Sequence, residues 1–191
     1  MRRRVVITGM GAVTPLGVDL RSSWEALCQG RSGIRRIAKF DPSGFRTQIA
    51  GEVRGFDPQR FMDAREVRHT DPFIHFALGA SLMAVQDAGL DGRMPSLRSG
   101  AMVGTAMGGI ATLERNHRLL LQGRGHRISP FFVPSLLPNM ATAHVAIRLG
   151  LRGPNSSAVT ACATGAQAIG EAFRCIQRGE ADVMVAGGTE A

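Results

Sequence analysis

The stretch SAVTACATGAQAIGEAFRCIQRGEADVMVAGG, residues 157–188, decides the fold. It predicts a strand at 157–161, a helix at 163–178 that ends at Gly179, and a second buried strand at 182–186. One face of the helix carries the small and apolar residues Gly165, Ile169, Ala172, Phe173 and Ile176. A strand, a helix and a strand in this order are typical of a parallel sheet covered by helices.

The rest of the chain continues this alternation. A strand is predicted at 5–8, and a helix capped by Asp19 or Ser22 ends at Gly30. Residues 31–70 read as an irregular surface excursion with short elements. Further on, the pattern predicts a helix at 73–88, a strand at 99–105, a helix at 110–122, an extended segment at 129–134 between two prolines, and a helix at 139–149. We therefore expect an α/β fold, with a mixed, mostly parallel sheet covered by helices on both faces.

Composition excludes several classes of protein. The net charge is +8, but 22 of the 23 basic residues are scattered arginines and Lys39 is the single lysine. No basic stripe with interleaved aromatics is present, so we expect no nucleic-acid binding, while a basic surface suits an acidic protein partner. The apolar run that starts at Val5 stops after three residues, too short for a signal peptide, and no run is long enough to span a membrane. We expect a cytoplasmic protein without membrane insertion.

A dinucleotide site is the first alternative for the glycine-rich segment that follows the first predicted strand. Gly9 and Gly11 match the start of the fingerprint, but Thr14 stands where the third glycine should open a helix. We therefore reject a dinucleotide-binding function.

The three cysteines are Cys28, Cys162 and Cys175. None belongs to a C-x-x-C pair, and an odd count argues against a disulfide framework, so neither a metal site nor disulfides are expected. Cys28 and Cys175 lie within predicted helices and are interpreted as buried structural residues.

Cys162 lies at the junction of a predicted strand and a predicted helix. The positive end of the helix dipole and unpaired N–H groups stabilise a thiolate there. Small neighbours leave the sulfur accessible, as in nucleophile elbows, and the same N–H groups can bind an oxyanion. Cys162 is therefore the candidate nucleophile, although a buried structural cysteine is the alternative.

Several short motifs, in order along the whole chain, carry a family resemblance. They are RVVITGMG (4–11), PLG (15–17), ISPFFVP (128–134), GLRGP (150–154), TAC (160–162) and ADVMVAGG (181–188). Together they resemble the N-terminal part of the β-ketoacyl-acyl carrier protein synthases, most closely the type II elongating synthases of bacterial fatty acid synthesis.

This resemblance implies a thiolase-like fold, of which residues 1–191 would be one N-terminal ketosynthase domain, an incomplete first half that stops before the C-terminal half. It implies that an acyl group moves from a carrier protein to Cys162 and that malonyl-carrier protein is then decarboxylated and condensed with it. It also implies that Met107 and Phe132 line the acyl pocket, although plain core packing is the alternative for both. The implied partners are acyl carrier protein and a second copy in a homodimer. No cofactor is implied, because phosphopantetheine on the carrier protein holds the substrates.

One part of the family machinery is absent from the sequence. The resemblance implies two histidines, a lysine and a glutamate for the condensation, all from the second half. None of the five histidines stands in such a motif; His144 reads as a helix residue and Lys39 as a loop residue. We therefore expect the 191-residue chain, taken alone, not to condense malonyl thioesters.

Other functions stay open. A polyketide ketosynthase would share every motif quoted above. A decarboxylating chain-length partner lacks the cysteine that Cys162 supplies and is disfavoured. A non-catalytic pairing subunit is opposed, though not excluded, by the intact nucleophile turn. A cysteine hydrolase is weakest, because no histidine is placed by the sequence to serve as its base.

Overall fold

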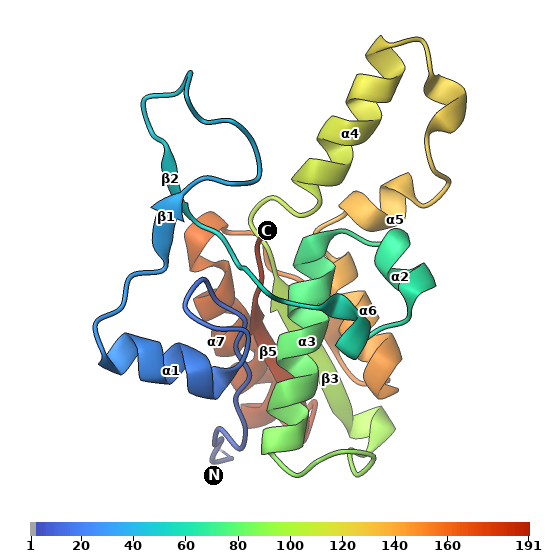
Figure 1. Cartoon of the computed structure of the whole chain (residues 1–191). Helices are drawn as coiled ribbons and strands as arrows, with labels where there is room; N and C mark the ends of the chain where they lie inside the picture. Colours follow the sequence, from blue (N-terminus) through green and yellow to red (C-terminus); the bar gives the residue numbers. More distant parts are fainter. Residues whose placement is uncertain (1–2) are drawn as a thin grey trace.

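Three parallel strands form the central sheet of the computed structural model, which describes every residue except the first two (Figure 1). β3 (Ser99–Gly104) lies in the middle, between β4 (Asn155–Ser156) and β5 (Val183–Gly188). β3 and β5 pair along their whole length, so their last residues, Gly104 and Gly188, lie opposite each other. The predicted parallel sheet is confirmed, and its strands end at one common edge.

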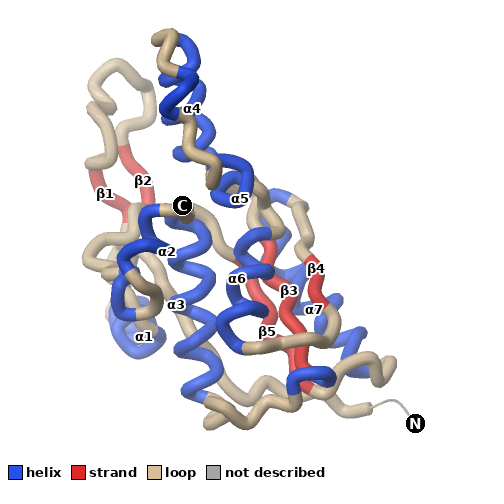
Figure 2. Tube along the Cα trace, turned by 90° about the vertical axis from the view of Figure 1, so that its right-hand side faces the viewer, coloured by secondary structure: helices blue, strands red, loops and turns tan. Residues whose placement is uncertain are grey.

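Helices cover both faces of this sheet (Figure 2). α7 (Thr164–Gln177) packs on one face, and α3 (Pro72–Asp87) and α6 (Met140–Leu149) lie on the other. The main hydrophobic core lies between β3 and these last two helices, and contains Phe73, Ile74, Ala77, Leu78, Ala101, Val103, Ala141, Val145 and Ala146. The predicted layers are therefore confirmed.

α3 shows why the long apolar run is a helix. Pro72 occupies its first turn, where a backbone N–H has no partner within the helix, so the missing donor costs nothing. Phe73 and Ile74 are fully buried, and Leu78 almost so. The chain leaves the helix at Gly89, whose φ of +64° favours glycine. The apolar run, sixteen residues in the structure, is too long for a strand and buries its side chains on the sheet.

Peripheral elements surround this core. Asp19 caps α1 (Leu20–Cys28) by accepting a hydrogen bond from the Ser22 N–H at 2.7 Å, as predicted. The excursion at 31–70 is confirmed: its short elements are β1 (Ile34–Arg36), antiparallel to β2 (Ile49–Gly51), then η1 (Pro58–Arg60) and α2 (Ala64–Arg68). In Figure 1 the β1–β2 pair and α4 (Ile110–Leu121) extend away from the sheet.

The segment at 129–134 corrects one prediction. It is not extended, because α5 (Phe132–Leu136) begins inside it and includes Pro134. Pro134 is the third residue of that helix, a position whose N–H would have no acceptor within the helix in any case. Two more single turns, η2 (Ser96–Arg98) and η3 (Gly125–Arg127), precede β3 and α5 respectively.

The N-terminal segment corrects another prediction. Residues 5–8 form no strand, and the side chains of Val6 and Ile7 are 64% and 79% exposed. The segment packs instead on α3, where a Cβ atom added to Gly9 would lie 2.3 Å from the Ala84 carbonyl oxygen. A groove of about 690 Å³ separates it from β5. Ile169 and Phe173 of α7 line this groove, so the predicted apolar face of that helix is only partly buried.

Ion pairs join the starting ends of β3 and β5. Arg98 donates to both carboxylate oxygens of Asp182, at 2.9 and 3.1 Å, and Arg3 donates to one at 2.8 Å. The Arg98 guanidinium, with support from Arg3, lowers the pKa of Asp182 from 3.8 to about 2.

This pKa shift predicts a contribution to acid stability. A carboxyl group whose pKa is lower in the folded state stabilises the fold above its unfolded pKa, and this contribution is lost as the pH falls through about 2. Asp182→Asn should therefore flatten the decline in the free energy of unfolding between pH 4 and pH 2. Urea unfolding at a series of pH values measures it; profiles of equal slope for both proteins would contradict the assignment.

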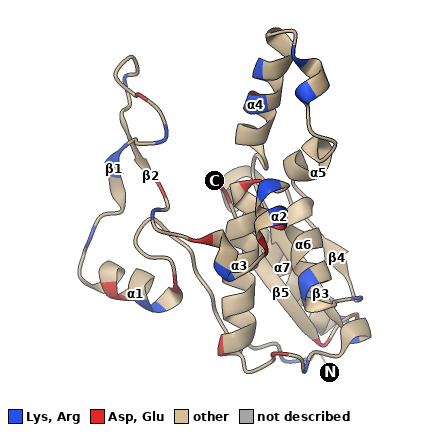
Figure 3. Cartoon of the chain, turned by 45° about the vertical axis from the view of Figure 1, so that its right-hand side comes forward, with Lys and Arg blue, Asp and Glu red and all other residues tan. Residues whose placement is uncertain are grey.

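The charged side chains are spread over several elements. Figure 3 shows Lys and Arg on α1, α2 and α4 and in the loops between elements.

Within residues 3–191, no helix is both long and apolar enough to cross a membrane.

Candidate functional site

Cys162 lies at a turn just before α7. It is the central residue of η4 (Ala161–Ala163), a single 3-10 turn, and α7 begins at Thr164. Its side chain is exposed to solvent. The predicted helix at 163–178 is thus confirmed, and the positive end of its dipole lies beside the thiol.

The approach to this turn differs from the prediction. The predicted strand at 157–161 is not formed, because pairing with β3 ends at Ser156. The chain then leaves the sheet edge, and the Ser157 hydroxyl donates to the Val103 carbonyl oxygen at 3.0 Å. The Thr160 N–H donates to the Thr164 hydroxyl at 2.8 Å, which closes the turn around Cys162.

Three glycines hold the turn against the ends of the strands. A Cβ atom at Gly104 would lie 2.4 Å from the Ala158 carbonyl oxygen and 2.1 Å from Cγ2 of Thr164. A Cβ atom at Gly188 would lie 2.9 Å from Cα of Gly165. β3, β5, the turn and the start of α7 therefore meet backbone to backbone. This places Cys162 at the carboxyl edge of a parallel sheet, where α/β proteins bind ligands.

The residue before the cysteine has an unusual backbone conformation. Ala161 has a φ of +49°, and it is the single residue other than glycine with positive φ among residues 3–191. Left-handed backbone costs about 1–2 kcal/mol for a residue with a Cβ atom. Such strain is concentrated at functional sites, and here it produces the sharp turn that presents the thiol.

Ala161→Val is expected to lower the free energy of unfolding by about 1–2 kcal/mol, because a β-branched side chain is disfavoured at positive φ. Ala161→Gly is the matched control and should unfold no more easily than the parent chain. Chemical denaturation measures both. Equal stability of the valine and glycine variants would show that this backbone conformation is not strained.

The other two cysteines lie in different surroundings. Burial, with a smaller contribution from Glu180, raises the pKa of the Cys175 thiol, which suits an inert structural residue as predicted. Cys28 was predicted to be buried, and this is wrong: it is exposed at the last position of α1. α1 buries only Ser23 and Ala26, so its other positions, including the last one, are not covered.

Three of the five histidines, His69, His75 and His144, lie in elements or contacts outside the nucleophile turn. His75 lies in the first turn of α3 and is hydrogen-bonded to the Thr70 hydroxyl at 2.9 Å, and burial lowers its pKa. His144 lies in α6, as predicted, and burial lowers its pKa as well. His69 stacks on the ring of Phe131. Among residues 3–191, no hydrogen bond joins a histidine to Cys162.

Met107 and Phe132, the two other predicted site residues, lie on neighbouring segments. Met107 belongs to the loop at 105–109 that follows β3 and is 60% exposed. Phe132 is half-buried at the start of α5. The loop rests on α5, because the Gly109 N–H donates to the Leu136 carbonyl oxygen at 3.0 Å. Both segments therefore lie near the carboxyl end of β3.

Sequence reasoning missed Glu190, two residues beyond β5. Its carboxylate accepts hydrogen bonds from the Thr105 hydroxyl and from the N–H groups of Ala106 and Met107, at 2.9 to 3.1 Å. The loop at 105–109 is thus held to β5. A single acidic residue after a buried strand gives no signal of this role in a sequence.

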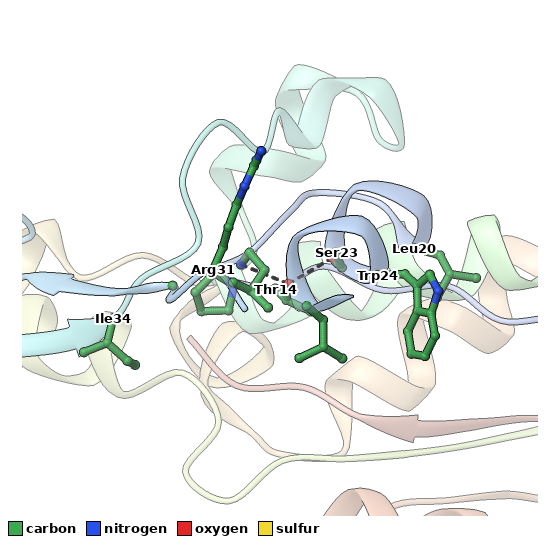
Figure 4. Close-up of a pocket in the computed structure, with 10 residues that line it drawn as sticks. Thr14, Leu20, Ser23, Trp24, Arg31 and Ile34 are labelled. Carbon is green, nitrogen blue, oxygen red and sulfur yellow. Dashed lines mark hydrogen bonds between the residues drawn. The ribbon is translucent and has the colours of Figure 1, made fainter. Parts of the chain in front are cut away.

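A separate hollow of about 420 Å³ lies beside α1 (Figure 4). Its lining is mostly apolar and includes Leu20, Trp24 and Ile34. The hydroxyls of Thr14 and Ser23 hydrogen-bond to each other at 2.9 Å, which leaves them occupied. The residues that line this hollow include no cysteine, histidine or carboxylate, and we assign it no chemistry.

Comparisons with known proteins agree with this geometry. The family model described as "Beta-ketoacyl synthase, N-terminal domain" matches residues 2–191. The chain is 46% identical over 190 residues to 3-oxoacyl-[acyl-carrier-protein] synthase 2 of Staphylococcus aureus (strain COL), and equally so to the protein of that name from Coxiella burnetii (strain RSA 493). Each alignment covers 99% of this chain and 46% of the relative, so the chain spans about half the length of the curated relatives it matches.

Solved structures show the same fold. The ishigamide ketosynthase/chain length factor superposes on the whole chain with a TM-score of 0.88 at 29% identity, covering 48% of that structure's chain. A ketosynthase in complex with its type II PKS acyl-carrier protein superposes on the whole chain with a TM-score of 0.85 at 26% identity, covering 52% of that structure's chain. These matches confirm the predicted thiolase-like ketosynthase fold.

Proposed function

The chain belongs to the β-ketoacyl synthase N-terminal domain family, and on that basis we propose that it carries the acyl-transfer centre of a 3-oxoacyl-acyl carrier protein synthase of fatty acid elongation. The observation that carries this proposal is the position of Cys162. Its thiol is exposed at a strained turn, at the start of α7 and at the carboxyl edge of the sheet.

The proposed reaction is a transthioesterification, in which an acyl group moves from the thiol of the carrier to the thiol of Cys162. The Cys162 thiolate attacks the carbonyl carbon of an acyl thioester, and a tetrahedral oxyanion forms. The carbon–sulfur bond to the carrier then breaks; the acyl group stays on Cys162, and the carrier leaves as a thiol with the proton that Cys162 gave up. The Ala163 N–H already donates to the Thr160 carbonyl oxygen at 3.1 Å. We therefore assign the oxyanion to the N–H of Cys162.

The second stage is decarboxylation of a malonyl thioester followed by condensation. We propose this stage only for proteins of the length of the curated relatives, not for these 191 residues. His75 lies in α3 and His144 in α6, and among residues 3–191 no hydrogen bond joins either of them to the cysteine turn. The Cys162 thiol and the Cys162 N–H support the acyl-transfer stage.

Fatty acid elongation is favoured over polyketide synthesis by similarity. The two 3-oxoacyl-[acyl-carrier-protein] synthases are 46% identical to the chain, whereas the ketosynthase of the type II PKS complex is 26% identical. The exposed nucleophile argues against a non-catalytic pairing subunit.

The proposed partner is an acyl carrier protein that presents its acyl group on phosphopantetheine. The net charge of +8 suits an acidic carrier, and one structural neighbour is a ketosynthase bound to its acyl-carrier protein. We further propose a cytoplasmic homodimer that needs no cofactor of its own.

Mass spectrometry tests the proposal. The purified chain, incubated with an acylated carrier protein, should gain the mass of the acyl group on the peptide that contains Cys162. Hydroxylamine should remove this mass, because it cleaves thioesters. Acylation confined to Cys28 or Cys175, or no acylation at all, would refute the assignment.

A further inference from the structure

Glu190, which follows β5, binds the loop at 105–109, which follows β3. One carboxylate oxygen accepts from the Thr105 hydroxyl at 3.0 Å. The other accepts from the N–H of Ala106 at 2.9 Å and from that of Met107 at 3.1 Å. The loop after β3 therefore folds around a single carboxylate supplied from beyond the end of β5.

The other side of the same loop rests on α5. Gly108 has a φ of +70°, and a Cβ atom there would lie 2.6 Å from the Leu136 carbonyl oxygen. A Cβ atom at Gly109 would lie 2.3 Å from the Ser135 carbonyl oxygen. The loop is thus fixed between Glu190 and the helix that begins with Phe132, and Met107 lies between these two points of attachment.

We propose that Glu190 is a positioning residue that sets which acyl chain lengths Cys162 accepts, by fixing the backbone of Met107. This inference rests on the proposed acyl transfer and on Met107 as a residue beside the acyl chain. Glu190 acts through the N–H groups of Ala106 and Met107 and touches no substrate itself.

A carboxylate is the group that this arrangement requires. Three donors converge on two oxygens, and an ionised carboxylate offers acceptors alone. An amide at the same position would turn an N–H₂ group toward at least one of these donors. If that group faces Thr105, the hydroxyl can accept from it but can no longer donate to position 190. Thr105 is 1% exposed, so a hydroxyl hydrogen left without an acceptor there is costly. Glu190→Gln is consequently a nearly isosteric change that weakens the attachment of the loop.

The test compares acylation of Cys162 by carrier-bound or pantetheine-bound acyl groups of four to sixteen carbons. Glu190→Gln should change the ratio of long-chain to short-chain acylation rates by about fivefold or more, the factor that corresponds to one unsatisfied buried hydrogen bond. Amide hydrogen exchange at Ala106 and Met107 should accelerate in the same variant.

A matched control comes from the neighbouring residue. The Thr189 hydroxyl donates to the Phe73 carbonyl oxygen at 2.7 Å, so Thr189→Val removes one hydrogen bond at the same strand end without touching the loop. Its chain-length ratio should equal that of the parent chain. Met107→Ala should shift the ratio by itself, and adding Glu190→Gln should change it little further, because both act at one point.

An unchanged chain-length ratio in Glu190→Gln, or a shift equal to that of Thr189→Val, would overturn the inference. So would additive effects of Glu190→Gln and Met107→Ala. Failure of the proposed function looks different, since the parent chain itself would then show no acylation of Cys162. In that case hydrogen exchange at Ala106 and Met107 still reports whether Glu190 holds the loop.

Discussion

Cys162→Ala is expected to abolish acyl-enzyme formation. The acyl group needs a thiolate at the start of α7, and no other cysteine lies there. Cys175 is buried, with a pKa raised by burial, and therefore reacts slowly. Cys28 is exposed, but it lies at the last position of α1 and not at the start of a helix.

The exposed Cys28 determines how this experiment is designed. A thiol-directed reagent labels any accessible cysteine, so labelling alone does not identify the nucleophile. Cys28→Ser should keep the full rate of acylation from a carrier-bound thioester, and Cys162→Ala should show no acyl mass above background. Intact-protein mass spectrometry after a fixed reaction time measures both. Persistent acylation of Cys162→Ala would place the acyl acceptor elsewhere.

Gly104→Ala is expected to damage both stability and acyl transfer. The added Cβ atom would lie 2.4 Å from the Ala158 carbonyl oxygen and 2.1 Å from Cγ2 of Thr164. Thr164 cannot easily rotate away, because it is 3% exposed and its hydroxyl accepts from the Thr160 N–H. Overpacking of this kind costs about 1–3 kcal/mol of the free energy of unfolding. Because the displaced atoms belong to the turn around Cys162, a shift near 1 Å should slow acylation about 100-fold.

Gly187→Ala is the matched control for this substitution. It lies at the same end of the sheet, in β5, and an added Cβ atom would meet nothing within 4 Å. Chemical denaturation and the rate of Cys162 acylation should both stay near the parent values. If Gly104→Ala also matched the parent in both measurements, the close approach of β3 to the nucleophile turn would not position the thiol.

Elements with a strong local signal were predicted well. α3 follows from its long apolar run and from Gly89, and α6 ends as expected at Gly150, whose φ is +65°. β3 and β5 were placed to within about two residues. In these cases burial and glycine conformation act within a short stretch of chain, so the residue pattern is sufficient.

Elements that depend on distant partners were predicted less well. Residues 5–8 have the composition of a buried strand, but a strand also needs a backbone partner, and here a groove lies where one would pair. The two prolines of the segment 129–134 predict an extended chain, but Pro134 lies in the first turn of α5, where a helix tolerates proline. The exposure of Cys28 depends on which face of α1 is covered.

The nucleophile turn shows which features the sequence predicts and which ones only the tertiary structure reveals. The residue types around Cys162, a thiol between small residues at the start of a helix, are enough to identify it as the candidate nucleophile, because dipole and accessibility are local properties. The positive φ of Ala161, the contact of Gly104 with the turn and the Glu190 carboxylate under Met107 come only from the tertiary structure. Each depends on segments far apart in the chain that meet at the carboxyl edge of the sheet, and no local pattern specifies such a meeting.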